Sequence, residues 1–262
     1  MLYAPDDRIG AGTHRGIGDR FGGVSLVAAA VCPHPPLIVP ELAGAAAPEL
    51  DDLRAAADAA IARLLAAAPE AILLVGGGPE TVRFNAADHG SLRPYGLDRH
   101  VRLWKVNCAG GDRLPLSLTI GAWLLNRSGT ELPRLARSVA HDATPAECAA
   151  FGASLILDDD PRVALLVLGD GSACRGVKAP GYDDPRAEAY DEGVAAALAG
   201  ADADALLGLD PELSAELRVA GRAPWQVLAG AVGAAGGDWR GELSHHRAPY
   251  GVAYFVANWE RS

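Results

Sequence analysis

A histidine enclosed by prolines is the first residue of this chain whose setting suggests chemistry. His34 lies in the run Cys32-Pro33-His34-Pro35-Pro36, directly after the apolar residues 24–31. An apolar run of this length is typical of a buried strand in an α/β sheet, and the prolines prevent both further ladder pairing and an immediate helix start. We therefore expect His34 at the carboxyl end of a core strand, where open α/β sheets bind ligands. An imidazole held there is suited to bind a metal ion or to act as an acid–base catalyst. The alternative is a loop histidine that is hydrogen-bonded to backbone groups.

A second polar stretch follows the apolar segment 163–168. It reads GDGSACR over residues 169–175. Because the carboxyl ends of parallel strands meet at one edge of a sheet, Asp170 is expected to project into the same crevice as His34. The two residues together form a candidate acid–base or metal-binding pair.

Four further residues near Asp170 have side chains capable of chemistry. Arg175 and Lys178 are candidates for binding a substrate carboxylate or phosphate. Cys174 is a candidate thiol nucleophile. Ser172 lacks the GxSxG context of a hydrolase nucleophile, so it is not expected to act as one.

The third candidate stretch is residues 242–246, ELSHH. In a regular strand alternate residues share a face, so Glu242, Ser244 and His246 are expected to point together and His245 to point the opposite way. A carboxylate and an imidazole brought against His34 would supply the two-histidine, one-carboxylate set of non-haem Fe(II) enzymes. An ordinary polar strand at the surface is the alternative.

Glycines follow the second expected strand, at Gly76-Gly77-Gly78-Pro79. Backbone amides of such a run can approach an anion, but no lysine follows and no nucleotide fingerprint is complete. We therefore interpret the run as a tight connection and expect no nucleotide cofactor.

Strand and helix patterns alternate along the chain and predict an α/β sandwich with a mostly parallel or mixed central sheet. One domain is expected over residues 24–262, after a glycine-rich, polar stretch at residues 1–23 that is interpreted as a disordered leader or a misassigned start. Helices are expected at residues 48–68, 116–126, 145–157, 186–198, 203–207, 211–220 and 224–234. Strands are expected at residues 24–31, 71–76, 101–106, 135–140 and 163–168, with an antiparallel pair at residues 242–246 and 251–258.

Composition limits the partners. The formal net charge is −10 and no basic cluster occurs, so nucleic acid and anionic membrane surfaces are not expected partners. The four cysteines are widely spaced, which favours reduced thiols in the cytoplasm over a disulfide framework.

These pieces in this order resemble the class III extradiol dioxygenase family, the LigB-like fold that is related to Memo-type proteins. The resemblance extends from about residue 24 to residue 259. It rests on residues 33–41 (PHPPLIVPE), on VALLVLGDGSACR at residues 163–175, on Tyr190-Asp191 and on the closing GVAYFVANW at residues 251–259. It implies a three-layer α/β/α sandwich, Fe(II) held by two histidines and a glutamate, a further histidine as acid/base on a catechol, and often a dimer.

Carried onto this sequence, the resemblance implies Fe(II) or Zn(II) held by His34, Glu242 and His245. Asp170 and His246 are then the catalytic candidates, Arg175 and Lys178 bind the small aromatic substrate, and a homodimer is the expected assembly. Two family histidines are missing, because Gly77, Gly78 and Pro79 follow the second strand and Ala173, in the stretch after residues 163–168, stands where the family has a histidine. Asp170, His89, His141 and His246 are the alternative ligands. A catalytically degenerate protein that binds a small ligand or a protein partner is the alternative function, and chemistry by Asp170, Cys174 and Arg175 on an anionic substrate is a third.

Overall fold

The computed structural model describes residues 25–104, 113–156 and 161–262. The expected leader at residues 1–23 and Cys108 lie outside these ranges. The other three cysteines, Cys32, Cys148 and Cys174, are buried and free of disulfides.

A seven-stranded mixed sheet forms the centre of the fold, with the order β3-β6-β2-β7-β1-β9-β8. Its four central strands run parallel, and β3, β9 and β8 are antiparallel to their neighbours. The strands are β1 (Ser25–Cys32), β2 (Ala71–Gly78), β3 (Val82–Phe84), β6 (Arg134–Ala140), β7 (Arg162–Leu168), β8 (Trp239–Arg247) and β9 (Tyr254–Arg261). A separate two-stranded sheet pairs β4 (His89–Ser91) with β5 (His100–Arg102).

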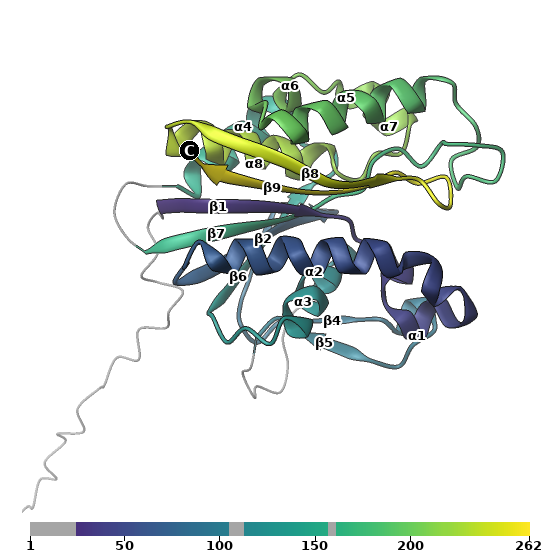
Figure 1. Cartoon of the computed structure of the whole chain (residues 1–262), viewed down its shortest axis with the longest axis horizontal. Coiled ribbons are helices and arrows are strands. Elements are labelled where there is room, and N and C mark those ends of the chain that lie inside the picture. The colour runs from purple at the N-terminus through teal and green to yellow at the C-terminus, as the bar shows by residue number, and fades with distance from the viewer. Residues whose placement is uncertain (1–24, 105–112, 157–160) are drawn as a thin grey trace, which may run out of the picture.

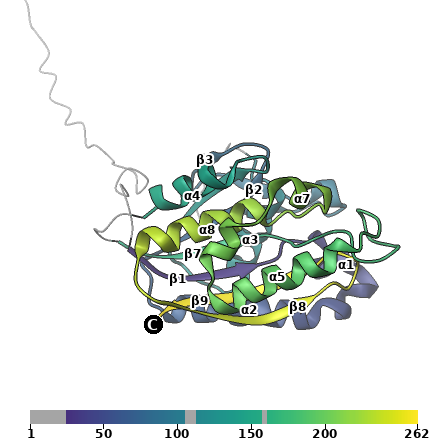
Figure 2. The ribbon, with the colours of Figure 1, turned by 90° about the horizontal axis from the view of Figure 1, so that it is seen from above.

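Helices cover both faces of the large sheet, so the expected α/β sandwich is confirmed (Figures 1 and 2). One face carries α1 (Pro40–Ala43), α2 (Asp51–Ala66) and α3 (Leu116–Arg127). The opposite face carries α4 (Pro145–Ser154), α5 (Arg186–Gly200), α6 (Ala203–Leu207), α7 (Pro211–Glu216) and α8 (Arg222–Ala235). Each face has its own apolar core, because the central strands are buried on both sides.

Several elements differ from the sequence-based expectation. The strand expected at residues 101–106 contributes only β5 to the small sheet, and its last residues lie outside the described ranges. The glycine run that the sequence predicts to be a tight connection belongs instead to β2, which continues to Gly78. The helix expected at residues 48–68 starts later, because a 3-10 turn over Gly44–Leu50 precedes α2.

Helix α4 begins at a complete capping box. The Thr144 hydroxyl accepts the Glu147 N–H at 3.3 Å, and the Glu147 carboxylate accepts the Thr144 N–H at 2.8 Å. Two orphan N–H groups are thereby satisfied, and Pro145 occupies the first helical position, where no donor is needed. The start of α4 is thus fixed just after the end of β6.

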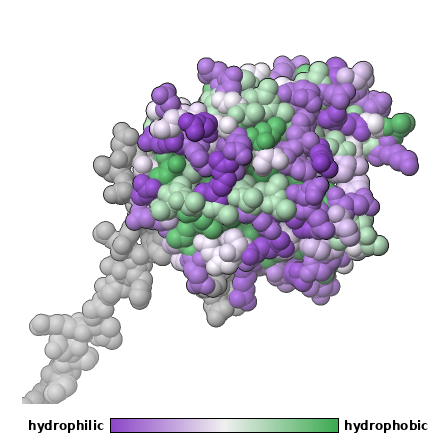
Figure 3. Space-filling view, in the orientation of Figure 1, coloured by the Kyte–Doolittle hydropathy of each residue, from purple (hydrophilic) through white to green (hydrophobic). Residues whose placement is uncertain are grey.

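Hydrophilic and hydrophobic residues are interspersed on the face of the molecule shown in Figure 3. Within the described ranges, no helix is both long enough and apolar enough to cross a bilayer.

Candidate functional site

The carboxyl ends of β1 and β7 place His34 beside Asp170. The Gly169 N–H donates to the Cys32 carbonyl at 3.0 Å and joins the two strand ends. The His34 N–H donates to Asp170 Oδ1 at 2.7 Å, and His34 Nδ1 lies 3.6 Å from the same oxygen. Only 9% of the His34 side chain and 13% of the Asp170 side chain are exposed. The structure therefore places His34 and Asp170 side by side, as expected from their positions at the ends of two parallel strands.

A second histidine, His141, reaches this edge from the end of β6. Its N–H donates to the Gly78 carbonyl at 3.1 Å. Its ring lies over Gly77, where a Cβ atom would be 2.8 Å from His141 Cε1. Glycine at the end of β2 therefore leaves the space that the imidazole occupies. Sequence reasoning named His141 only among alternative ligands, although it follows a strand just as His34 does.

The start of α8 closes the same edge. The Gly221 N–H donates to the Asp170 carbonyl at 2.8 Å. The buried Arg222 guanidinium donates to the carbonyls of His141 (2.5 Å) and Ala143 and to Gln226 Oε1 (3.1 Å). Arg222 thereby ties the segment after β6 to α8 and holds the backbone of His141. We call His34, Asp170 and His141 the strand-edge site.

Burial shifts the pKa values of two residues of the strand-edge site, Asp170 and His141. Desolvation raises the pKa of Asp170, and the neighbouring His34 charge and N–H partly oppose this rise. Desolvation lowers the pKa of His141, and the charges of His34 and Arg222 lower it further. A histidine with a lowered pKa is neutral at pH 7. The His141 imidazole is therefore available there as a hydrogen-bond acceptor or as a base.

A cavity of about 210 Å³ opens against His141. We call it the His141 cavity. Its lining comprises His141, Pro211, Ser214, Ala215, Arg218, Val219, Ala220 and Arg222. Two arginines and a histidine thus line it, and its lining contains no carboxylate, in a chain with a net charge of −10.

The structure does not bring Glu242 to His34. Glu242 lies opposite Asn258, which pairs with Ala30, four residues before His34. Two interstrand spacings and four residues of rise correspond to a separation on the order of 15 Å. The Glu242 carboxylate instead accepts a hydrogen bond from Arg63 at 2.6 Å.

The expected assignment of the β8 residues to the two faces of the sheet is wrong. A β-bulge shifts the register between Leu243 and His245, and the extra residue reverses the alternation beyond it. Glu242 and His245 therefore share the α2 face, where Glu242 binds Arg63. Burial lowers the pKa of His245, and the charge of Asp52, in the first turn of α2, opposes this decrease.

His246 lies on the opposite face of β8, beneath α5. Its ring stacks on Phe255 at a centroid distance of 4.7 Å, and its Nδ1 is 3.9 Å from Glu192 Oε1. Asp191 is fully buried nearby, and its burial raises the pKa of its carboxyl group. The charge of His246 opposes this rise, so the two residues are close neighbours. His246 therefore belongs to a different cluster from His34.

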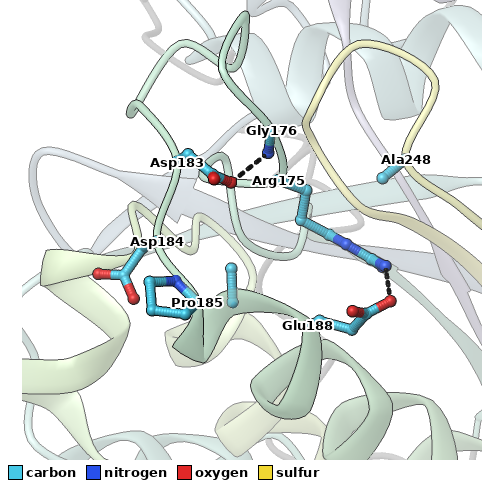
Figure 4. Close-up of a pocket in the computed structure, with 8 residues that line it drawn as sticks. Arg175, Gly176, Asp183, Asp184, Pro185, Glu188 and Ala248 are labelled. Carbon is cyan, nitrogen blue, oxygen red and sulfur yellow. Dashed lines mark hydrogen bonds and ion pairs between the residues drawn. The ribbon is translucent and has the colours of Figure 1, made fainter.

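Arg175 and Lys178 lie in the loop after β7, away from the strand-edge site. Arg175 binds Glu188 at 2.6 Å and lies 3.9 Å from Asp191. Figure 4 shows its guanidinium turned toward Glu188 at a cavity of about 450 Å³. Lys178 is exposed and does not line that cavity. Arg175 is thus engaged by carboxylates rather than free for an anionic substrate.

Cys174 does not fit the role of a nucleophile. Its side chain is buried, and its Sγ faces the carbonyls of Gly181 (3.4 Å) and Leu217 (3.5 Å). Burial raises the pKa of the thiol, which disfavours the reactive thiolate.

The family's iron centre does not fit the described residues. In residues 25–104, 113–156 and 161–262, no group of three or more His, Cys, Asp or Glu side chains is placed to hold a metal ion. The three predicted ligands do not meet. His34 lies at the strand-edge site, whereas Glu242 and His245 lie on the α2 face of β8.

The position of Glu242 gives a testable expectation. Glu242→Gln should change the free energy of unfolding by less than about 0.5 kcal/mol, because exposed ion pairs contribute little and Arg63 keeps its bond to Glu260 at 3.0 Å. The iron and zinc content of the purified protein should stay unchanged. Chemical denaturation and elemental analysis test both expectations, and a loss of bound metal would restore Glu242 as a ligand.

Comparison with known proteins identifies no family. No family model matches the chain, and no curated protein matches it. The solved structure of the uncharacterised protein JW3007 from Escherichia coli K12 aligns over 89% of this chain and 99% of that chain, with a TM-score of 0.47 and 13% identity. At these values the match carries no argument about function.

Proposed function

We propose that this chain is a LigB-like, class III extradiol dioxygenase-like protein that binds a small aromatic molecule at the strand-edge site, without the iron centre of that family. One observation carries the proposal. His34, Asp170 and His141 gather at one sheet edge and His141 lines a cavity there, while Glu242 and His245 lie elsewhere. The proposal corresponds to the degenerate, ligand-binding alternative of the sequence analysis.

The described side chains suit a phenolic ligand. An apolar cavity of about 150 Å³ is large enough for benzene, so the His141 cavity, at about 210 Å³, has room for one substituted ring. Pro211, Ala215 and Val219 offer apolar surface to that ring. The neutral imidazole of His141 can accept a phenolic O–H.

Metal-dependent ring cleavage, the activity that the resemblance implies, is the second candidate. His34 Nδ1 favours it, because this nitrogen is buried, has no hydrogen-bond partner among the described residues and lies 3.6 Å from a carboxylate oxygen. Such an imidazole beside a carboxylate is of the donor type that Fe(II) or Zn(II) binds. About one metal ion per chain, lost in His34→Asn, would favour this candidate.

The cellular setting is also part of the proposal. Cys32, Cys148 and Cys174 are buried and unpaired, which supports a reducing compartment such as the cytoplasm. The net charge of −10 disfavours nucleic acid and anionic membranes as partners. The homodimer stays a prediction, which light scattering would test.

Catechol titration tests the proposed function. Under anaerobic conditions, catechol should bind the wild-type protein, and His141→Asn should weaken binding about 10-fold, which corresponds to one lost hydrogen bond. His245→Asn is the matched control, because His245 is a partly buried histidine outside the site. Calorimetry gives the affinities. The absence of catechol binding, or equal losses in both variants, would contradict the proposal.

A further inference from the structure

The segment between β7 and α5 projects from one end of the molecule (Figures 1 and 2). We call residues 176–183 the projecting loop. Val177 is 88% exposed and Tyr182 is 76% exposed, whereas Tyr95, the next most exposed large apolar residue of the described ranges, is 43% exposed. A singly exposed apolar residue is ordinary, but two on one projecting loop form a surface that a partner can cover.

Hydrogen bonds hold the projecting loop in one conformation. The Gly176 N–H donates to Asp183 Oδ1 at 2.8 Å and joins the two ends of the loop. The Ala179 N–H donates to the Gly176 carbonyl at 2.9 Å, and the Tyr182 N–H donates to the Ala179 carbonyl at 3.1 Å. Val177 and Tyr182 adjoin the two joined ends, so they lie close together. A surface ordered in this way loses little conformational entropy when it binds a partner.

The backbone of Tyr182 is strained. Its φ is +65°, in the left-handed region that favours glycine over residues with a Cβ atom. A side chain that is 76% exposed makes few contacts within its own chain to offset this strain. Strained residues gather at binding sites, and tyrosine is enriched among the residues that dominate interfaces. The strain at Tyr182 therefore indicates a role outside the monomer.

The cavity of about 450 Å³ beside Arg175 adjoins the projecting loop (Figure 4). We call it the Arg175 cavity. Its lining includes one arginine and three carboxylates, those of Asp183, Asp184 and Glu188, so its charge balance is negative. A cavity of about 150 Å³ holds benzene, so the Arg175 cavity has room for a lysine side chain. It also offers apolar surface from Pro185, Ala187 and Ala248.

Lys178 carries the charge that complements this cavity. It is exposed, forms no ion pair with any residue that the structure describes, and does not line the cavity of its own chain. Residues 175–188 contain three basic and three acidic side chains, in a chain with a net charge of −10. Two copies of the chain therefore repel each other over most of their surface but not at this segment.

We propose that two copies of this chain associate through the projecting loop, with Val177 and Tyr182 of both copies packed at a two-fold axis and Lys178 of each copy inserted into the Arg175 cavity of the other. Such an interface is self-complementary, as a two-fold dimer requires. The apolar stem of Lys178 lies along Pro185, and its ammonium group reaches the partner's Glu188. The inference gives the predicted homodimer an interface and does not depend on ligand binding.

An exchange of charges between two variants tests the interface. Glu188 is suited to this test, because its carboxylate is 73% exposed and bonds only Arg175 among the described residues. Lys178→Glu and Glu188→Lys each place like charges opposite one another, so each variant alone should have a dimer dissociation constant at least about 10-fold higher than the wild type. An equal mixture of the two variants should dimerise as tightly as the wild type, because each position then faces the opposite charge. Sedimentation equilibrium of the full chain measures these constants. A mixture that associates no better than either variant alone would overturn the inference.

Tyr182→Gly tests the apolar part of the interface. It should raise the dissociation constant at least about 10-fold. It should also raise the Tm of the monomer by about 2–4 °C, because it removes the left-handed strain. Tyr95→Ser and Arg93→Glu are the matched controls, since both residues are exposed and lie outside the projecting loop. An unchanged dissociation constant in Tyr182→Gly, or an equal increase in the controls, would overturn the inference.

The outcomes separate this inference from the other proposals. If the wild-type protein is monomeric at every concentration, the inference and the predicted homodimer both fail. If the dimer persists in the variants of the projecting loop, the homodimer stands and this interface is wrong. Failure of catechol to bind would contradict the proposed function alone, because neither Lys178 nor the Arg175 cavity belongs to the strand-edge site.

Discussion

Replacing Gly152 by alanine is expected to lower the free energy of unfolding by about 3 kcal/mol, at the upper end of the cost of overpacking. Helices α4 and α8 cross at Gly152 and Gly230. A Cβ on Gly152 would meet the Val227 carbonyl and lie 2.7 Å from the Ala231 nitrogen. Both atoms are backbone, so no side chain can turn aside, and the helices must separate. Chemical denaturation measures the loss.

Two other glycines sharpen this prediction. Gly230→Ala should have a similar effect, because its Cβ would lie 2.7 Å from Ala149 Cα. Gly233→Ala, in the same helix, would meet nothing within 4 Å and should stabilise the protein by about 0.5–1 kcal/mol through helix propensity. If all three variants had equal stability, the close crossing of α4 and α8 would be contradicted.

Arg222→Met is expected to destabilise the protein by about 3 kcal/mol and to weaken catechol binding. The substitution leaves the carbonyls of His141 and Ala143 and the Gln226 side chain without this donor. Each buried polar group left unpaired costs about 1–3 kcal/mol. The segment that carries His141 then loses its tie to α8, so the imidazole is less well positioned for a ligand.

The control for Arg222 is an arginine with similar bonds at the surface. Arg162 is exposed and donates to the carbonyls of Ala67 (2.8 Å) and Ala68 (3.3 Å). Water can replace those bonds, so Arg162→Met should cost less than about 1 kcal/mol and leave catechol affinity unchanged. Denaturation and calorimetry on both variants make the comparison. If both variants lost the same free energy of unfolding, the burial of Arg222 would not explain the contribution of its hydrogen bonds.

The approach of His34 and Asp170 could be predicted from the sequence. Each residue follows an apolar run that forms a buried parallel strand, and the carboxyl ends of such strands meet at one edge. The prolines after Cys32 fixed the position of His34 locally. His141 carried the same signal, since it follows β6, but its ring could be placed only once β6 was known to lie beside Gly77 of β2.

The face of each residue in β8 could not be predicted in the same way. Strict alternation places Glu242 with His246, but the bulge before His245 leaves them on opposite faces. A bulge depends on the pairing of two strands rather than on the residues of one strand. The error therefore arose from the tertiary structure. The bulge changes only the faces within β8, whereas the strand order and register keep Glu242 and His245 away from His34.

The sequence by itself determined the α/β class, most of the helices and strands, and the strand ends that carry polar residues, because these depend on local apolar patterns and on prolines. Only the tertiary structure decided the strand order, the position of His141 over Gly77 and the cationic lining of the cavity. These features bring together residues that are distant along the chain. Their contacts depend on how strands and helices pack, which no local pattern encodes.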